Sequence, residues 1–188
     1  PAEKFVNKIP VKKHDHVLIP AGTVHCSGAD TMVLEISATP YIFTFKLWDW
    51  GRVDLDGKPR PIHLEHGAAN IQWYRNTEWV HKNLINAVAE VYSDENGTVV
   101  RTGLHEREFL DTFRFTTSSA LPVHRNGSVH MLNLVDGTRA VLRSKSDAFP
   151  PLELHYAETC IVPQAAGDYE IYSPDGSEVK VILACVRN

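Results

Sequence analysis

The sequence predicts an all-β fold made of two related β units, the first of them incomplete, with a short helical insert. Short runs of β-branched, aromatic and other apolar residues recur along the chain and are bounded by Gly, Pro and Asp. A pattern of an acidic residue, two further residues, two aliphatic residues and a proline occurs at 15–20 and again at 158–163. Each copy is typical of a turn followed by a buried strand that a proline ends. Two copies therefore suggest two similar units.

The first half of the chain is expected to contain three strands and two helices. The strands are predicted at 17–20, 32–36 and 41–48, where β-forming residues are densest. Prolines at 59 and 61 precede a predicted helix over 62–71, and a second helix is predicted over 77–83.

The second half is expected to consist of strands. The Asp-Glu-Asn-Gly sequence at 94–97 predicts an exposed turn in a connector. Two short strands, at 131–134 and 140–142, flank Asp136-Gly137, a dipeptide typical of a β-hairpin turn. Three more strands are predicted at 159–162, 169–172 and 179–186.

Composition excludes several classes of function. The chain carries 19 basic and 23 acidic residues, which argues against nucleic acid as a partner. It has no apolar run of the ~18 residues that a membrane helix requires, and no apolar signal region at its start. Its three cysteines form no C-x-x-C pair, so we expect reduced thiols and a cytoplasmic protein.

The sequence Ile-Pro-Ala-Gly-Thr-Val-His at 19–25 is the most informative motif. Proline and glycine fix a tight turn, so His25 is expected to project from a rigid scaffold. A neutral imidazole suits Zn²⁺ and similar ions, whereas the simpler interpretation is a histidine packed at the end of a strand. The motif resembles the second motif of the cupin family, in which such a histidine binds a metal inside a small β-barrel.

The segments that follow narrow this resemblance. A strand with Leu34-Glu35 is followed by Thr-Phe-Lys-Leu-Trp-Asp-Trp-Gly-Arg at 44–52 and by Asp-Gly-Lys-Pro-Arg-Pro-Ile-His at 56–63. In order and spacing these segments resemble the class I mannose-6-phosphate isomerases, most strongly over 15–67 and weakly through the C-terminal repeat. The resemblance implies cupin-like β-barrel or jelly-roll units and a zinc-dependent interconversion of mannose 6-phosphate and fructose 6-phosphate in carbohydrate metabolism.

The resemblance also implies roles for four residues. His25 would be a zinc ligand, and Arg52 would bind the substrate phosphate. Lys46 stands where the family has an arginine that stabilises the intermediate or orients the sugar, and Glu35 matches a carboxylate that handles a proton or orients the substrate. In a straight strand Lys46 and Arg52 would share a face about 20 Å apart, and a bend at Gly51 would bring them closer. Lysine lacks the bidentate fork of arginine, so Lys46 is a departure from the family.

The expected zinc site is incomplete in this chain. The family takes its other ligands from a Q-x-H-P motif and a Glu upstream of the histidine motif, and the 24 residues before His25 contain neither. A catalytic zinc usually has about three protein ligands. We therefore expect Zn²⁺ as a cofactor that needs ligands absent from this chain, which would be the C-terminal portion of a longer isomerase. The alternative is a non-catalytic, sugar-phosphate-binding or structural cupin domain.

The same reasoning predicts the domain organisation. Residues 1–67 would be the C-terminal half of a catalytic cupin unit, 68–107 a helical or mixed connector, and 108–188 a degenerate cupin-like barrel. In the second copy of the repeat Asp168 stands where the first has His25, and His124 and His130 are six residues apart. This spacing favours a structural role for the C-terminal unit. The expected partner is a small sugar phosphate, with no nucleic acid and no membrane, and pairing of exposed strand edges into a homodimer is left open.

Overall fold

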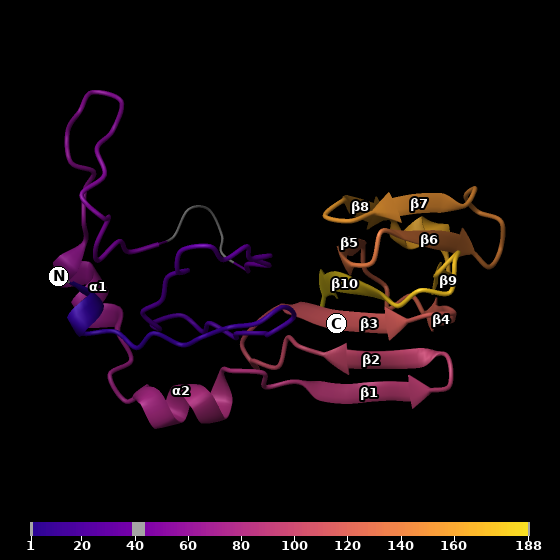
Figure 1. The fold of residues 1–188 in the computed structure, drawn as a ribbon, viewed down its shortest axis with the longest axis horizontal. Helices are drawn as coiled ribbons and strands as arrows, with labels where there is room; N and C mark the ends of the chain where they lie inside the picture. Colours follow the sequence, from indigo (N-terminus) through magenta and orange to yellow (C-terminus); the bar gives the residue numbers. More distant parts are fainter. Residues whose placement is uncertain (1, 39–43, 188) are drawn as a thin grey trace. The chain divides into compact units, whose positions relative to one another are not determined.

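The computed structural model describes residues 2–38 and 44–187 and divides the chain into two units, Pro1–Asn86 and Ala87–Asn188 (Figure 1). Within these residues, no helix is long and apolar enough to cross a membrane. Two short α-helices lie in the first unit, and the named strands lie in the second. The expected all-β class with a short helical insert is confirmed.

The two helices of the first unit occur where the sequence predicts them. Helix α1 is Leu64–Asn70, two residues shorter at its start than expected, because the backbone of His63 is not helical, with φ −121° and ψ 60°. The N–H of His63 donates to the Lys46 carbonyl at 2.7 Å. Helix α2 is Thr77–Asn83, and the side chain of Asn76 caps it by accepting from the Trp79 N–H at 3.0 Å.

The predictions of strands at 17–20 and 32–36 are wrong. The prediction of a strand at 41–48 is wrong over 44–48, and residues 41–43 lie outside the described residues. A strand forms only where a neighbour supplies a ladder of hydrogen bonds. Around 17–20 the chain has a single bridge, Val17 to Ile85, and the Leu18 N–H donates to the Leu84 carbonyl at 2.9 Å. This segment therefore pairs with the end of α2, and the apolar residues at 33 and 34 stay exposed.

The second unit consists of two antiparallel sheets. The six-stranded sheet has the order β1-β2-β3-β10-β5-β8, and the four-stranded sheet has the order β4-β9-β6-β7. The strands are β1 Ala89–Asp94, β2 Gly97–Arg101, β3 Leu110–Thr117, β4 Ala120–Val123, β5 His130–Asp136, β6 Arg139–Ser144, β7 Leu152–His155, β8 Thr159–Val162, β9 Tyr169–Tyr172 and β10 Val179–Val186. The predicted strands at 159–162, 169–172 and 179–186 are confirmed with these bounds.

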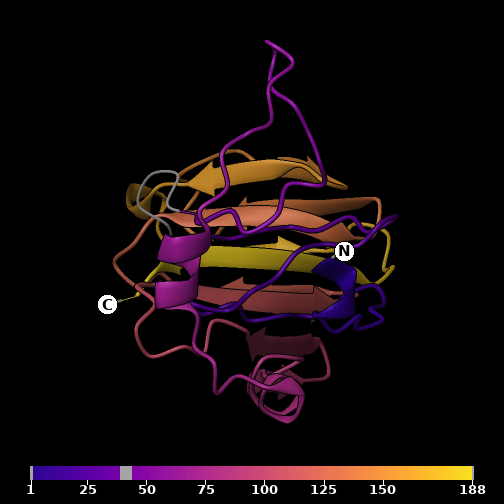
Figure 2. The same cartoon turned by 90° about the vertical axis from the view of Figure 1, so that its left-hand side faces the viewer.

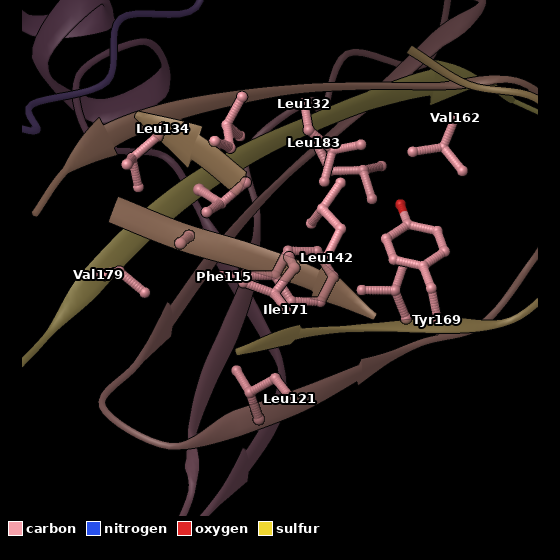
Figure 3. Packing of buried hydrophobic residues seen from close by; sticks show 14 of the residues in the cluster. Phe115, Leu121, Leu132, Leu134, Leu142, Val162, Tyr169, Ile171, Val179 and Leu183 are labelled. Atoms are coloured by element: carbon pink, nitrogen blue, oxygen red, sulfur yellow. The ribbon is translucent and has the colours of Figure 1, made fainter. Parts of the chain in front are cut away.

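Strand β10 lies at the centre of the six-stranded sheet, between β3 and β5, and Figure 2 shows it in yellow between these neighbours. Its side chains alternate between the core and the outer face, as its burial pattern shows. Leucines, isoleucine and valines from both sheets meet in one core, together with Phe115 and Tyr169 (Figure 3). This apolar burial stabilises the unit.

The hairpin predicted at Asp136-Gly137 is wrong, although both flanking strands exist. Strand β5 pairs with β10 and β8, whereas β6 pairs with β7 and β9, so the turn passes from one sheet to the other. Gly137 has φ +85°, and a Cβ there would lie 2.8 Å from the side chain of Val179. Glycine is needed because the turn crosses closely over β10.

The six-stranded sheet begins earlier than the expected C-terminal unit. Strands β1 and β2 fall inside the segment 68–107, and β2 pairs with β3 along its length. The expected turn at 94–97 joins them, and the carboxylate of Asp94 accepts from the N–H groups of Asn96 and Gly97 at 2.8 and 3.1 Å. Residues 89–94 and 97–101 of that segment therefore belong to the sheet.

Candidate functional site

The turn that precedes His25 is held in place by the rest of the first unit. The Thr23 N–H donates to the Pro20 carbonyl at 3.2 Å, and Gly22 has φ +83°, as the third residue of a type II turn requires. A Cβ on Gly22 would lie 2.6 Å from the Asn70 carbonyl oxygen, and the Gly22 carbonyl accepts from the Gln72 N–H at 3.0 Å. The turn is thus fitted against the end of α1.

Arg75 stabilises the same turn through hydrogen bonds. Its Nη1 donates to the carbonyls of Pro20 and Ala21, at 3.1 and 2.8 Å, and to the hydroxyl of Thr23 at 2.6 Å. The guanidinium carbon also lies 5.3 Å from the ring centre of Trp79, within the range of a cation–π interaction. The scaffold that the motif predicts for His25 therefore exists, and Arg75 is part of it.

His25 is exposed, and its Nδ1 lies 2.9 Å from the Thr23 carbonyl oxygen. A carbonyl only accepts, so Nδ1 carries the proton and the lone pair of the neutral ring is on Nε2. A hydrogen bond of this kind commonly orients a histidine that binds a metal. The ring can therefore offer one nitrogen to a ligand.

The described residues do not make a complete zinc site. Over 2–38 and 44–187, no group of three or more His, Cys, Asp and Glu side chains is placed to hold a metal ion. Zinc takes four ligands, about three of them from protein in catalytic sites. His25 supplies one donor, so the zinc does not fit these residues alone.

Lys46 lies in a small ionic cluster around the buried carboxylate of Asp49. Arg60 donates to both oxygens of Asp49 at 2.5 Å from Nε and Nη2, and the Lys46 ammonium is 3.3 Å from Oδ1. The Arg60 guanidinium lowers the pKa of Asp49 below its ordinary value, and Asp49 raises the pKa of Arg60 in return. Lys46 keeps a third of its side chain exposed, so it can still meet a ligand.

Arg52 lies one turn further on, with an exposed side chain. Its N–H donates to the Asp49 carbonyl at 2.9 Å across a turn in which Trp50 and Gly51 have φ +57° and +69°. The chain therefore does bend at Gly51. The second cation that binds the Asp49 carboxylate beside Lys46 is Arg60, however. Arg52 is an exposed cation nearby in the sequence.

Glu35 is exposed in the segment that forms no strand. Among the described residues, Glu35 makes no hydrogen bond or ion pair with His25, Lys46 or Arg52. The four predicted site residues are therefore not brought into contact with one another in the described part of this unit.

Sequence reasoning missed three residues that organise this unit: Asp49, Arg60 and Arg75. Arg60 follows Asp56-Gly57 at the spacing of the quoted motif, which is a signal that could have identified it. Nothing in the local sequence indicates that Arg75 contacts a turn more than 50 residues earlier, because that contact depends on the tertiary fold.

Tryptophans flank the same cluster. The rings of Trp48 and Trp50 are 4.2 Å apart between centres, and both side chains are about half exposed. Such a pair offers an apolar surface beside the charges of Lys46 and Asp49.

Comparison with known proteins gives partial matches. Mannose-6-phosphate isomerase from Streptococcus mutans is 35% identical over 63 residues, which are 34% of this chain and 20% of that protein. Mannose-6-phosphate isomerase ManA from Bacillus subtilis is 22% identical over 135 residues, which are 72% of this chain and 40% of that protein. The chain thus spans well under half the length of these relatives. No protein-family model matches it.

The crystal structure of the mannose 6-phosphate isomerase from Bacillus subtilis aligns with a TM-score of 0.54 at 13% identity, over 74% of this chain and 39% of that one. At this identity the likeness concerns the fold, which is the expected all-β, cupin-like one. The partial sequence matches show similarity to mannose-6-phosphate isomerases. Membership of class I and a place in the C-terminal portion stay predictions.

Proposed function

We propose that this chain is part of a zinc-dependent aldose–ketose isomerase that interconverts mannose 6-phosphate and fructose 6-phosphate in the cytoplasm. The observation that carries the proposal is the clamped turn at 20–23, which presents His25 with its Nδ1 occupied and its Nε2 available. The partial sequence relationship to mannose-6-phosphate isomerases supports the same reaction.

Each residue of the proposed site has a role that its chemistry permits. The exposed guanidinium of Arg52 would bind the phosphate of the sugar through paired hydrogen bonds. The ammonium of Lys46 would stabilise negative charge that develops on a sugar oxygen. Glu35 is an exposed carboxylate that could move the proton between C1 and C2. The zinc would have His25 as one ligand, and its other ligands would have to come from outside the described residues.

A second candidate function is a domain that binds a sugar phosphate without turning it over. Two observations favour it: in the described part of the chain no three His, Cys, Asp or Glu side chains are placed to hold a metal ion, and the ammonium of Lys46 already faces the carboxylate of Asp49. A cation that is paired in this way is less available to stabilise a reaction intermediate.

Binding of mannose 6-phosphate to this chain, measured by titration calorimetry with zinc and again with a chelator, tests both candidates. Arg52→Glu should weaken binding at least about tenfold if the phosphate lies there. Lys58→Glu is the matched control, because it reverses an exposed charge in the same loop. Equal affinities for the two variants would remove Arg52 from the site.

Turnover then distinguishes the two functions. In the whole protein, the isomerase predicts zinc-dependent formation of fructose 6-phosphate that is lost in His25→Ala, and a fall in kcat rather than a rise in KM in Glu35→Gln. Binding that is unaffected by the chelator, with no turnover, would support the non-catalytic domain instead.

A further inference from the structure

The second unit contains a cavity of about 270 Å³ that the proposed isomerase does not use. Its walls come from β1, β2, β3, β4, β5 and β10 and from the loop after β4, and they are mostly apolar. Val91 of β1 lies at a half-exposed edge, whereas Phe115 of β3 and Leu183 of β10 are buried. A mostly apolar, partly enclosed space with a few polar groups is typical of a small-molecule site.

Two polar residues of the lining, the buried His130 and the exposed Asn126, make hydrogen bonds within the protein. His130 is 2% exposed, its Nδ1 lies 2.9 Å from the Tyr169 hydroxyl, and its Nε2 lies 3.1 Å from the Asn126 side-chain oxygen. The Asn126 amide in turn donates to the thiol of Cys185 at 3.2 Å. Burial also lowers the pKa of His130 to about 4, which keeps the ring neutral at neutral pH. A metal ion or an anion would have to break this network.

The neighbouring arginine does not turn the wall into an anion site. Arg125 is not one of the residues that line the cavity. Its Nε donates to the Gln164 side chain at 3.2 Å, and its Nη2 donates to the Ser128 carbonyl. An anion in the cavity would therefore lack a facing cation from this residue.

His124 is one of the exposed polar residues of the lining, beside Tyr92, whose hydroxyl donates to Asp94, and Asn126, whose amide donates to Cys185. It lines the cavity, most of its side chain is exposed, and its Nδ1 lies 2.8 Å from the carboxylate of Asp168. A carboxylate at neutral pH only accepts, so Nδ1 carries the proton and Nε2 of the neutral ring is an acceptor. In the described part of the chain, this Nε2 makes no hydrogen bond. A hydroxyl or N–H of a ligand would complement it.

We propose that this cavity binds a compact, uncharged, mostly apolar molecule that carries one hydroxyl, of the size of a single-ring phenol. Its ring lies against Phe115 and Leu183, and its hydroxyl donates to Nε2 of His124. The site is independent of the proposed sugar-phosphate site, which lies on residues of the first unit.

Titration of the whole chain with 4-methylphenol, followed by protein NMR, tests the proposal. The expected result is saturable binding at one site, with shifts at residues that line the cavity. Toluene, which lacks the hydroxyl, should bind about three- to tenfold more weakly, as expected for the loss of one neutral hydrogen bond. 4-Methylphenyl phosphate should not bind there.

Three variants locate the site. Val91→Trp fills the cavity at its edge and should abolish binding. Met131→Trp is the matched control, because Met131 is also about half exposed but does not line the cavity. His124→Ala should lower the affinity for 4-methylphenol to that for toluene and leave toluene binding unchanged.

Each contrary result overturns a stated part of the proposal. Absence of saturable 4-methylphenol binding, or equal binding by the Val91→Trp and Met131→Trp variants, refutes the site. Preferred binding of the phosphate ester refutes the uncharged ligand class. An unchanged 4-methylphenol affinity in His124→Ala refutes the hydroxyl contact. Because His124 and Val91 are both exposed side chains, their substitution should leave the unit folded.

Discussion

Gly22 should be far less tolerant of alanine than a second glycine that has nearly the same backbone torsion. Gly22 has φ +83° and Gly57 has φ +75°. An L-residue with a Cβ in this left-handed region costs about 1–2 kcal/mol. Both Gly22→Ala and Gly57→Ala should therefore lower the free energy of unfolding by this common amount.

The surroundings of the two glycines then separate the variants. A Cβ on Gly22 would lie 2.6 Å from the carbonyl oxygen of Asn70, whereas a Cβ on Gly57 would meet nothing within 4 Å. To relieve that contact the turn must move from α1 and lose the hydrogen bond from Gln72 N–H, which is worth about 0.5–1.5 kcal/mol. Gly22→Ala should thus cost about 1.5–3.5 kcal/mol in total, and Gly57→Ala about 1–2 kcal/mol.

Urea unfolding followed by tryptophan fluorescence measures this difference directly. The four tryptophans of the chain are at 48, 50, 73 and 79, so the signal comes from the first unit alone. The NMR signals of the His25 ring give a second readout, because only Gly22→Ala should shift them. Equal midpoints for the two variants would refute the view that the turn before His25 is fixed by its fit against α1.

Three further predictions concern the ion cluster, the buried histidine and the core. Arg60→Gln should lower the urea midpoint of the tryptophan signal, because it removes the two guanidinium donors to the buried Asp49 and leaves Lys46 as its cation. Arg52→Gln should leave the midpoint unchanged, and the reverse order would contradict the cluster. Folding lowers the pKa of His130 from 6.5 to about 4. Between these two pH values the unfolded chain binds more protons than the folded chain, so the free energy of unfolding should fall by roughly 3 kcal/mol as the pH is lowered from 6.5 to 4. Circular dichroism melts should show this slope in the parent and not in His130→Gln. Leu134→Ala should cost about 2–5 kcal/mol in the same melts, because Leu134 is 0% exposed in the core; a loss below 1 kcal/mol would contradict that packing.

Local sequence was enough where a structural element depends mainly on its own residues. The apolar run at 179–186, rich in β-branched residues, predicts strand β10 with its observed bounds, and the turn at 20–23 follows from Pro20 and Gly22. The segment 32–36 has the residues of a strand and forms none, because strand formation also requires a partner ladder.

Longer-range features could not be predicted in this way. Asp136-Gly137 predicts a reversal of the chain. The local residues do not determine whether the two flanking strands pair with each other or belong to different sheets. For the candidate site, the motif identified Lys46, and yet Arg60, which shares the Asp49 carboxylate with it, became visible only when the fold brought Arg60 back to Asp49, 11 residues earlier in the chain. His124 and Asp168 are likewise 44 residues apart.

The central place of β10 has a consequence for synthesis on the ribosome. Of the ten strands it is the last to be made, yet β3 and β5 each need it as a neighbour. Until residues 179–186 leave the exit tunnel, the six-stranded sheet exists at most as two separate pieces, β1-β2-β3 and β5-β8, each with an open edge. The nascent unit should therefore depend on chaperones until this strand inserts, and a premature stop before residue 179 should yield an aggregating product.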